Sequence, residues 1–298
     1  MTAGAAAPRT RHFVGGDGIR LVAEVWGEAS APPLVLLHGG GQTRHSWGRT
    51  GPRLAALGWR VVAPDLRGHG ASGWPADGDY DLGRYAEDVR ALVAALGGRP
   101  VLVGASLGGL SALLAAGEPP GAAVRALVLV DVAHRPDPRG FHRIAAFMRR
   151  HADGFAEIGD AAVAVSAGLP HRRPPDGPEG LRHNLRREGD RWVWHWDPRM
   201  LDAFEGRMDP PGMAERLLDA ACRADVPVLL VRGGISDVLR EDVAEQFCER
   251  VPGARRVDVA GAGHMVAGDR NEHFIDAVVP FLEELEERRS GDLRDRRD

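Results

Sequence analysis

The stretch that most constrains how this chain folds is VLVGASLGGL, residues 101–110. It places Ser106 between an apolar run and a helix-forming run, with Gly104 two residues before it and Gly108 two residues after it. Glycine lets a chain turn sharply, and small neighbours let the turn pack closely against adjacent strands. This G-x-S-x-G pattern predicts a nucleophile elbow, a strained strand-to-helix turn that projects the serine hydroxyl beside the free N–H groups of a helix N-terminus.

Two other interpretations of the same stretch compete with the elbow. In the first, Ser106 is the N-cap of the following helix. In the second, GASLGG is a dinucleotide-binding loop, and Asp131 at the end of the next strand is the ribose-binding acid. The dinucleotide fingerprint requires a glycine where Ser106 stands, so the elbow is the favoured interpretation.

Short apolar runs alternate with helical patterns on both sides of the elbow. The strands expected from these runs span 21–26, 34–38, 60–65, 101–104, 126–131, 227–233 and 255–261. The helices expected between them span 46–57, 82–96, 106–117, 239–250 and 270–287. Several strands are continuously apolar, which is typical of strands covered on both faces. The alternation predicts an α/β fold with a mostly parallel sheet and helices on both faces.

The alternation breaks between about 134 and 222, where the composition turns rich in Arg, Pro, His and Trp. Helical patterns continue there, at 141–152, 155–167 and 178–188. We interpret residues 135–221 as a helical cap packed over one end of the sheet. The core domain then comprises 10–134 and 222–287, and the charged segment 288–298 is expected to be a flexible tail.

Composition sets the broad class of protein. The 298 residues are 44% apolar and 27% charged, which is ordinary for a globular protein. The net charge of −4 gives no reason to expect nucleic acid or a membrane as a partner. The N-terminus lacks the apolar segment of a signal peptide, so we expect a cytoplasmic protein. Cys222 and Cys248 are too few for a disulfide framework and lack metal-ligand spacing, so no metal site is expected.

A serine nucleophile needs a base within hydrogen-bond reach and an acid that orients the base. The chain supplies candidates for both in loops that follow later strands. Asp237 follows the strand at 227–233, and His264 lies in the glycine-rich loop after the strand at 255–261. Asp131, at the end of the strand at 126–131, is the rival candidate for the acid.

The order Ser106, Asp237, His264 makes the chain resemble the α/β-hydrolase superfamily. LLHGGGQ (36–42) resembles the H-G oxyanion loop of that family, and APDLRGHGAS (63–72) resembles its D-x-R-G-x-G-x-S stretch. The motifs together with the inserted segment resemble those of capped bacterial esterases, lactonases, carbon–carbon bond hydrolases and cofactor-free haloperoxidases. The resemblance implies an α/β-hydrolase fold with an eight-stranded sheet and a cap inserted between strands six and seven.

The resemblance also implies a role for each site residue. Ser106 would attack a carbonyl carbon, His264 would accept its proton, and Asp237 would fix the imidazole tautomer. The N–H groups of Gly40 and Leu107 would hold the oxyanion.

Further residues are expected near the substrate or around the site. The expected substrate-binding residues are Gly39, Gly41, Trp47 and Trp194. Trp192, Trp194 and Trp196 alternate, so they should share one face of an extended segment. We expect His38 to orient the oxyanion loop, His69 to pack within its own loop, and Asp65 with Arg67 to hold a turn. Arg172 and Arg173 are expected on the charged surface of the cap.

The sequence therefore predicts a serine hydrolase that cleaves an ester-like bond of a small molecule through an acyl-enzyme, without a metal or organic cofactor. The alternatives are a lactonase, a carbon–carbon bond hydrolase or a perhydrolase with the same triad. A hydrolase-fold ligand receptor with very slow turnover is an alternative from another class. The sequence determines neither the natural substrate nor the oligomeric state, and a homodimer is one of the oligomeric states considered.

Overall fold

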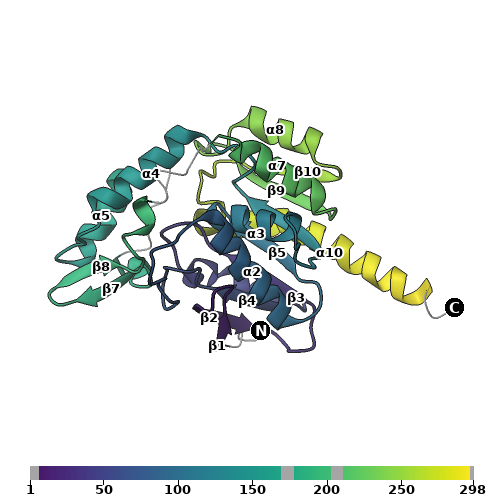
Figure 1. Cartoon of the computed structure of the whole chain (residues 1–298), viewed down its shortest axis with the longest axis horizontal. Helices are drawn as coiled ribbons and strands as arrows, with labels where there is room; N and C mark the ends of the chain where they lie inside the picture. Colours follow the sequence, from purple (N-terminus) through teal and green to yellow (C-terminus); the bar gives the residue numbers. More distant parts are fainter. Residues whose placement is uncertain (1–6, 169–177, 203–210, 296–298) are drawn as a thin grey trace.

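One eight-stranded sheet forms the centre of the molecule (Figure 1). The computed structural model describes residues 7–168, 178–202 and 211–295. The strands lie in the spatial order β1-β2-β4-β3-β5-β6-β9-β10. Their bounds are β1 Arg9–Val14, β2 Arg20–Trp26, β3 Pro33–Leu37, β4 Arg60–Pro64, β5 Val101–Ala105, β6 Ala126–Val130, β9 Val228–Gly233 and β10 Ala254–Val259. Strands β4 to β10 of this order are parallel, and β2 is antiparallel to both β1 and β4. The predicted fold class is confirmed.

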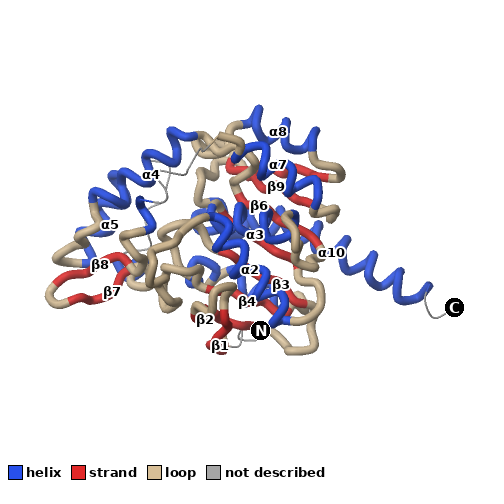
Figure 2. The backbone as a smooth tube through the Cα atoms, viewed as in Figure 1, coloured by secondary structure: helices blue, strands red, loops and turns tan. Residues whose placement is uncertain are grey.

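Helices cover both faces of the sheet because its central strands are apolar on both faces. In β3, Val35 and Leu37 pack into one core cluster, whereas Leu34 and Leu36 pack into the other. The first cluster lies beneath α2 Leu82–Leu96, α3 Leu107–Gly117, α7 Met213–Arg223 and α8 Glu241–Arg250. The second lies beneath α1 Thr50–Ala56 and α10 Asn271–Asp295. Figure 2 shows the helices on either side of the strands.

The cap leaves the sheet after β6 and returns before β9, so it is inserted between the sixth and seventh strands of the main sheet. Its elements are α4 Pro138–Arg150, α5 Ile158–Gly168, η2 Pro178–Leu181, β7 Leu185–Glu188 and β8 Arg191–Trp194. Strands β7 and β8 form an antiparallel hairpin at the outer end of the cap (Figure 1). The helix expected over 178–188 is therefore wrong. Gly189 turns the chain with φ of 60°, which brings Leu185 opposite Trp194.

Two expected boundaries fall inside helices of the structure. Helix α7 packs against α3 so closely that a Cβ at Gly117 would overlap the carbonyl of Ala220. The expected end of the cap at 221 therefore lies within a helix that packs on the core. At the other end of the chain, α10 continues to Asp295, through most of the segment 288–298 that was expected to be a flexible tail. No helix in the described ranges has the length and apolar character to cross a membrane.

Five loops meet at the carboxyl ends of the parallel strands, and they carry the residues singled out from the sequence. These are the loops after β3, β5, β6, β9 and β10. The carboxyl edge of an open α/β sheet is where ligands bind in such folds, because the loops there converge. The short elements η1 Arg44–Trp47 and α9 Val266–Asp269 flank this edge.

Candidate active site

Ser106 occupies a strained turn between β5 and α3. Its φ of 47° and ψ of −116° lie outside the regions that a serine normally adopts. The side chain makes no capping hydrogen bond to α3, so the structure does not support the N-cap interpretation. A Cβ at Gly104 would overlap the Gly108 carbonyl, and one at Gly108 would overlap the backbone of Leu37. Both glycines are thus required by the turn, and its geometry is that of the predicted elbow.

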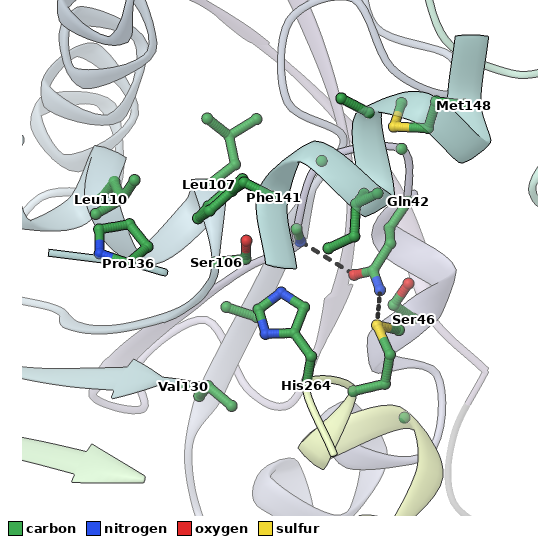
Figure 3. Close-up of a pocket in the computed structure, with 18 of the residues that line it drawn as sticks. Gln42, Ser46, Ser106, Leu107, Leu110, Val130, Pro136, Phe141, Met148 and His264 are labelled. Atoms are coloured by element: carbon green, nitrogen blue, oxygen red, sulfur yellow. Dashed lines mark hydrogen bonds between the residues drawn. The ribbon is translucent and has the colours of Figure 1, made fainter. Parts of the chain in front are cut away.

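His264 lies in the loop between β10 and α9, and its side chain is 14% exposed. Its Nδ1 makes a hydrogen bond of 2.7 Å to Oδ2 of Asp131. Ser106 and His264 line the same cavity, and Figure 3 shows the imidazole beneath the serine hydroxyl. No hydrogen bond joins the two side chains within the part of the chain that the structure describes. Such contacts are often loose until substrate is bound.

The acid beside His264 is Asp131, and the expectation that Asp237 supports the imidazole is wrong. Asp237 follows β9 as predicted, but its carboxylate pairs with Arg143 of the cap helix α4. Asp131 directly follows β6, which lies between β5 and β9 in the sheet. That position brings its carboxylate to the ring, and the chain order of serine, acid and histidine is unchanged.

Asp131 is fully buried, and its carboxylate is surrounded by donors. Oδ1 accepts a hydrogen bond from the Gly233 N–H at 2.8 Å. Oδ2 accepts from the Ser236 hydroxyl at 2.5 Å in addition to His264. These donors satisfy the hydrogen-bonding capacity of a carboxylate that has no access to water. Sequence reasoning missed Ser236, which directly precedes the aspartate it had singled out.

The loop after β3 is fixed on either side of Gly40. The N–H of Gly39 donates to Oε1 of Gln42 at 3.0 Å, and the N–H of Gly41 donates to Nε2 of His69 at 3.1 Å. No described residue accepts a hydrogen bond from the Gly40 N–H. The loop thus leaves one N–H group available for a ligand, at the residue expected to serve the oxyanion.

Two buried histidines hold this loop in place. His38 donates from Nδ1 to the Gly39 carbonyl at 2.8 Å and accepts the Leu66 N–H at Nε2 at 2.9 Å. His69 likewise donates from Nδ1 to the Arg67 carbonyl at 2.8 Å. Burial lowers the pKa of His38 to about 4 and that of His69 to about 3, so both rings are neutral and can accept at Nε2. The expected structural roles of both histidines agree with these contacts.

The Gln42 side chain links the oxyanion loop to the histidine loop. While Oε1 accepts from Gly39, Nε2 donates to the sulfur of Met265 at 2.9 Å, and Figure 3 draws both hydrogen bonds. Met265 is the residue directly after His264. Gln42 belongs to the LLHGGGQ motif, but nothing in the motif shows which loop its amide reaches.

A cavity of about 220 Å³ opens beside these residues, between the core and the cap. Its apolar walls come mainly from two places, the start of α3 and the inner face of the cap. They include Leu107, Leu110, Phe141, Ile144, Met148, Leu181, Trp194 and Trp196. Gly39, Gly41 and Trp47 also line the cavity. Trp192 does not line the cavity with Trp194 and Trp196. Its ring packs beneath the guanidinium groups of Arg182 and Arg187.

The sequence model of the alpha/beta hydrolase fold matches residues 32–270, which is most of the chain. The chain belongs to the α/β-hydrolase family.

Curated relatives of this α/β-hydrolase include two named hydrolytic enzymes. Esterase Rv0045c of Mycobacterium tuberculosis is 33% identical over 270 residues, covering 87% of this chain and 85% of the relative. The 3-hydroxybutyrate-oligomer hydrolase of Cupriavidus necator is 29% identical over 266 residues, covering 82% of this chain and 87% of the relative. The matches span nearly whole chains, so the core and the cap are both included.

Solved structures agree with the family assignment. A crystal structure of esterase Rv0045c has a TM-score of 0.72 at 30% identity, with 94% of each chain covered. An α/β-hydrolase from Novosphingobium aromaticivorans has a TM-score of 0.79 at 30% identity, covering 94% of this chain and 99% of the other.

The remaining motif residues of this α/β-hydrolase support its loops. Asp65 accepts the Arg44 N–H at 2.7 Å and the Ala71 N–H at 2.8 Å. Arg67 is fully buried and makes two hydrogen bonds of 2.7 Å to the carboxylate of Asp88 in α2. Asp65 and Arg67 thus support their loops through separate partners, and the expectation that the two hold the turn together is wrong. Arg172 and Arg173 lie outside the described residues.

Within the described ranges, no group of three or more His, Cys, Asp or Glu side chains could hold a metal ion.

Proposed function

We propose that this α/β-hydrolase is a serine hydrolase that cleaves a carboxylic ester bond of a small molecule through an acyl-enzyme. The observation that carries the proposal is the shared cavity of the strained Ser106 and the Asp131-bound His264. A hydroxyl becomes a useful nucleophile when a neutral imidazole can accept its proton. The imidazole is oriented for this task because its Nδ1 is occupied by Asp131, which leaves Nε2 as the acceptor.

The reaction follows from these positions. Oγ of Ser106 attacks the ester carbonyl carbon while Nε2 of His264 accepts the hydroxyl proton. When the tetrahedral intermediate collapses, the bond to the alcohol oxygen breaks, and His264 returns the proton to that oxygen. Water then attacks the acyl-enzyme with the same histidine as base, which releases the carboxylic acid and regenerates Ser106. Asp131 stabilises the imidazolium formed in each half of the reaction.

The negative charge on the carbonyl oxygen would be held by two backbone N–H groups, those of Gly40 and Leu107. No described residue accepts a hydrogen bond from either N–H, and both residues line the cavity. Leu107 begins α3, so its N–H is one of the groups that a helix N-terminus leaves without an intrahelical partner. Losing one oxyanion donor typically costs about 100- to 1000-fold in rate.

The comparisons and the cavity support ester hydrolysis of a small molecule. The relative at 33% identity is named an esterase, and the cavity is lined mainly by apolar side chains that suit the carbon skeleton of an ester. Trp47 and Trp194 are proposed contacts of that skeleton. The cytoplasmic location and the homodimer considered from the sequence stay predictions.

A chromogenic short-chain ester tests the proposal. Wild-type protein should hydrolyse p-nitrophenyl butyrate, and Ser106→Ala should lower kcat by at least about 1000-fold. Ser166→Ala, which alters an exposed serine of α5 in the cap, is the matched control and should keep the wild-type rate. Undiminished hydrolysis by Ser106→Ala would refute the proposed nucleophile. Cleavage of lactones or diketones without any cleavage of esters would refute the proposed bond type.

A further inference from the structure

We propose that Ser236 is a positioning residue of the active site, which holds the Asp131 carboxylate in the orientation that His264 requires. The inference rests on the proposed function, because it concerns the same histidine and acid. Ser236 lies in the loop after β9, and its hydroxyl donates to Oδ2 of Asp131, the same oxygen that binds the imidazole.

The direction of the Ser236 hydroxyl proton follows from its other contacts. Oγ accepts the N–H groups of Val238 and Leu239, both at 3.2 Å. A serine hydroxyl has one proton and two acceptor lone pairs, so these two bonds leave the proton for Asp131. The ionised carboxylate can only accept. Ser236 is therefore the donor and Asp131 the acceptor. The two N–H groups of the loop hold the hydroxyl in this direction.

Three donors around Asp131 determine how its carboxylate is turned. The Gly233 N–H holds Oδ1, while His264 and Ser236 converge on Oδ2. Asp131 has no exposed surface, so water cannot replace a missing donor without rearrangement of the site. Removing the Ser236 hydroxyl leaves only the imidazole on Oδ2, and the carboxylate can then rotate away from the position that keeps Nε2 directed at Ser106.

The loop that carries Ser236 is itself anchored to the site. The Ile235 N–H donates to the Ala262 carbonyl at 3.0 Å, two residues before His264. The Ser236 N–H donates to the Gly233 carbonyl at 3.0 Å. The next residue, Asp237, pairs with Arg143 of the cap. The loop after β9, which the sequence predicted to supply the acid, thus supplies a hydroxyl to the acid and a carboxylate to the cap.

Kinetics of four variants test this assignment: Ser236→Ala, Ser236→Thr, Asp131→Asn and the double variant Asp131→Asn with Ser236→Ala. We expect Ser236→Ala to lower kcat for p-nitrophenyl butyrate by about 10- to 100-fold with little change in KM, because a hydrogen bond to a charged group is lost at the catalytic acid. Ser236→Thr keeps the hydroxyl and should recover most of the activity. In an Asp131→Asn background, Ser236→Ala should cost less than about 2-fold, because the charge through which it acts is already gone.

Two results would overturn the inference. One is a kcat of Ser236→Ala within about 2-fold of wild type. The other is an equal loss in the Asp131→Asn background, which would show that the hydroxyl only supports the loop. Thermal unfolding of each variant reports any general loss of stability. Neither result would affect the proposed nucleophile, whose own test is the activity of Ser106→Ala.

Discussion

Two residues of the site, Ser106 and Asp131, have left-handed backbone conformations. Their φ values are 47° and 52°, and Asp225 is the only other described non-glycine residue with a positive φ. Such a conformation costs about 1–3 kcal/mol and persists only where the surrounding structure enforces it. Here the enforcement comes from adjacent strands: the Ser106 N–H donates to the Val130 carbonyl, and the Asp131 N–H donates to the Val231 carbonyl. The strain coincides with the proposed nucleophile and the proposed acid.

Gln42 gives a prediction at the same scale. Gln42→Ala removes the bonds to the Gly39 N–H and to the Met265 sulfur, so the oxyanion loop loses its link to the histidine loop. We expect kcat for p-nitrophenyl butyrate to fall about 10-fold, with a smaller change in KM, since loss of a hydrogen bond typically costs about 1 kcal/mol. Steady-state kinetics measure the change.

Gln42→Glu separates the two bonds of Gln42. It keeps an acceptor for Gly39 but cannot donate to the sulfur of Met265 when ionised. If the link between the loops matters, Gln42→Glu should also be slow. If Gln42→Ala has the kcat of wild type, the amide does not position the oxyanion loop.

Sequence reasoning predicted Ser106 and His264 because each has a local signal, the glycines of the elbow and the glycine-rich loop after the last strand. It chose the wrong acid because Asp131 and Asp237 have the same local signal. Both follow parallel strands, and both give the chain order serine, acid, histidine. Only the spatial positions separate them: Asp131 reaches the ring, whereas Asp237 meets Arg143, which comes from a cap that the sequence could not place.

At the scale of elements, the core was predictable and the cap less so. Helix α2 has the predicted bounds, since Asp81 caps its start by accepting the Gly83 N–H and Gly97 follows its last residue. The hairpin β7–β8 was missed because the spacing of Leu181 and Leu185 also fits a helix. Its strands are only four residues each, which is too short for a clear alternating pattern. The hairpin forms because the chain reverses direction at Gly189.

The cap is joined to the core by backbone bonds that no sequence pattern indicates. The Gly70 N–H donates to the His195 carbonyl at 2.7 Å, and the Asp197 N–H donates to the Gly68 carbonyl at 2.8 Å. Tyr80 also donates from its hydroxyl to Asp197 at 2.6 Å. These contacts bring Trp194 and Trp196 over the cavity, which is why the tryptophan-rich segment of the cap lines the site.

Across the whole molecule, the buried histidines make stability depend on pH. Burial lowers the pKa of His69 from 6.5 to about 3. Between these two pH values the histidine is protonated in the unfolded chain and neutral in the folded chain. The stability it contributes is complete above pH 6.5 and is lost as the pH falls toward 3. Between pH 7 and pH 5 this loss amounts to about 2 kcal/mol.

His69→Gln tests this origin of the pH dependence, because the amide oxygen can still accept the Gly41 N–H but does not titrate. Urea unfolding at pH 7 and pH 5 should show a drop in unfolding free energy that is about 2 kcal/mol smaller in the variant than in wild type. His12→Gln, on the exposed strand β1, should keep the wild-type drop. An equal drop in wild type and His69→Gln would contradict the assignment.

The central claim is that Ser106 is activated by His264 and Asp131, and covalent labelling tests it most directly. A fluorophosphonate reacts with activated serines, so the rate at which the Ser106 peptide gains the adduct can be followed by mass spectrometry. We predict that Asp131→Asn slows this rate by about 1000-fold or more, whereas Asp237→Asn slows it by less than about 10-fold. Rapid labelling of Ser106 in Asp131→Asn, together with slow labelling in Asp237→Asn, would contradict the account.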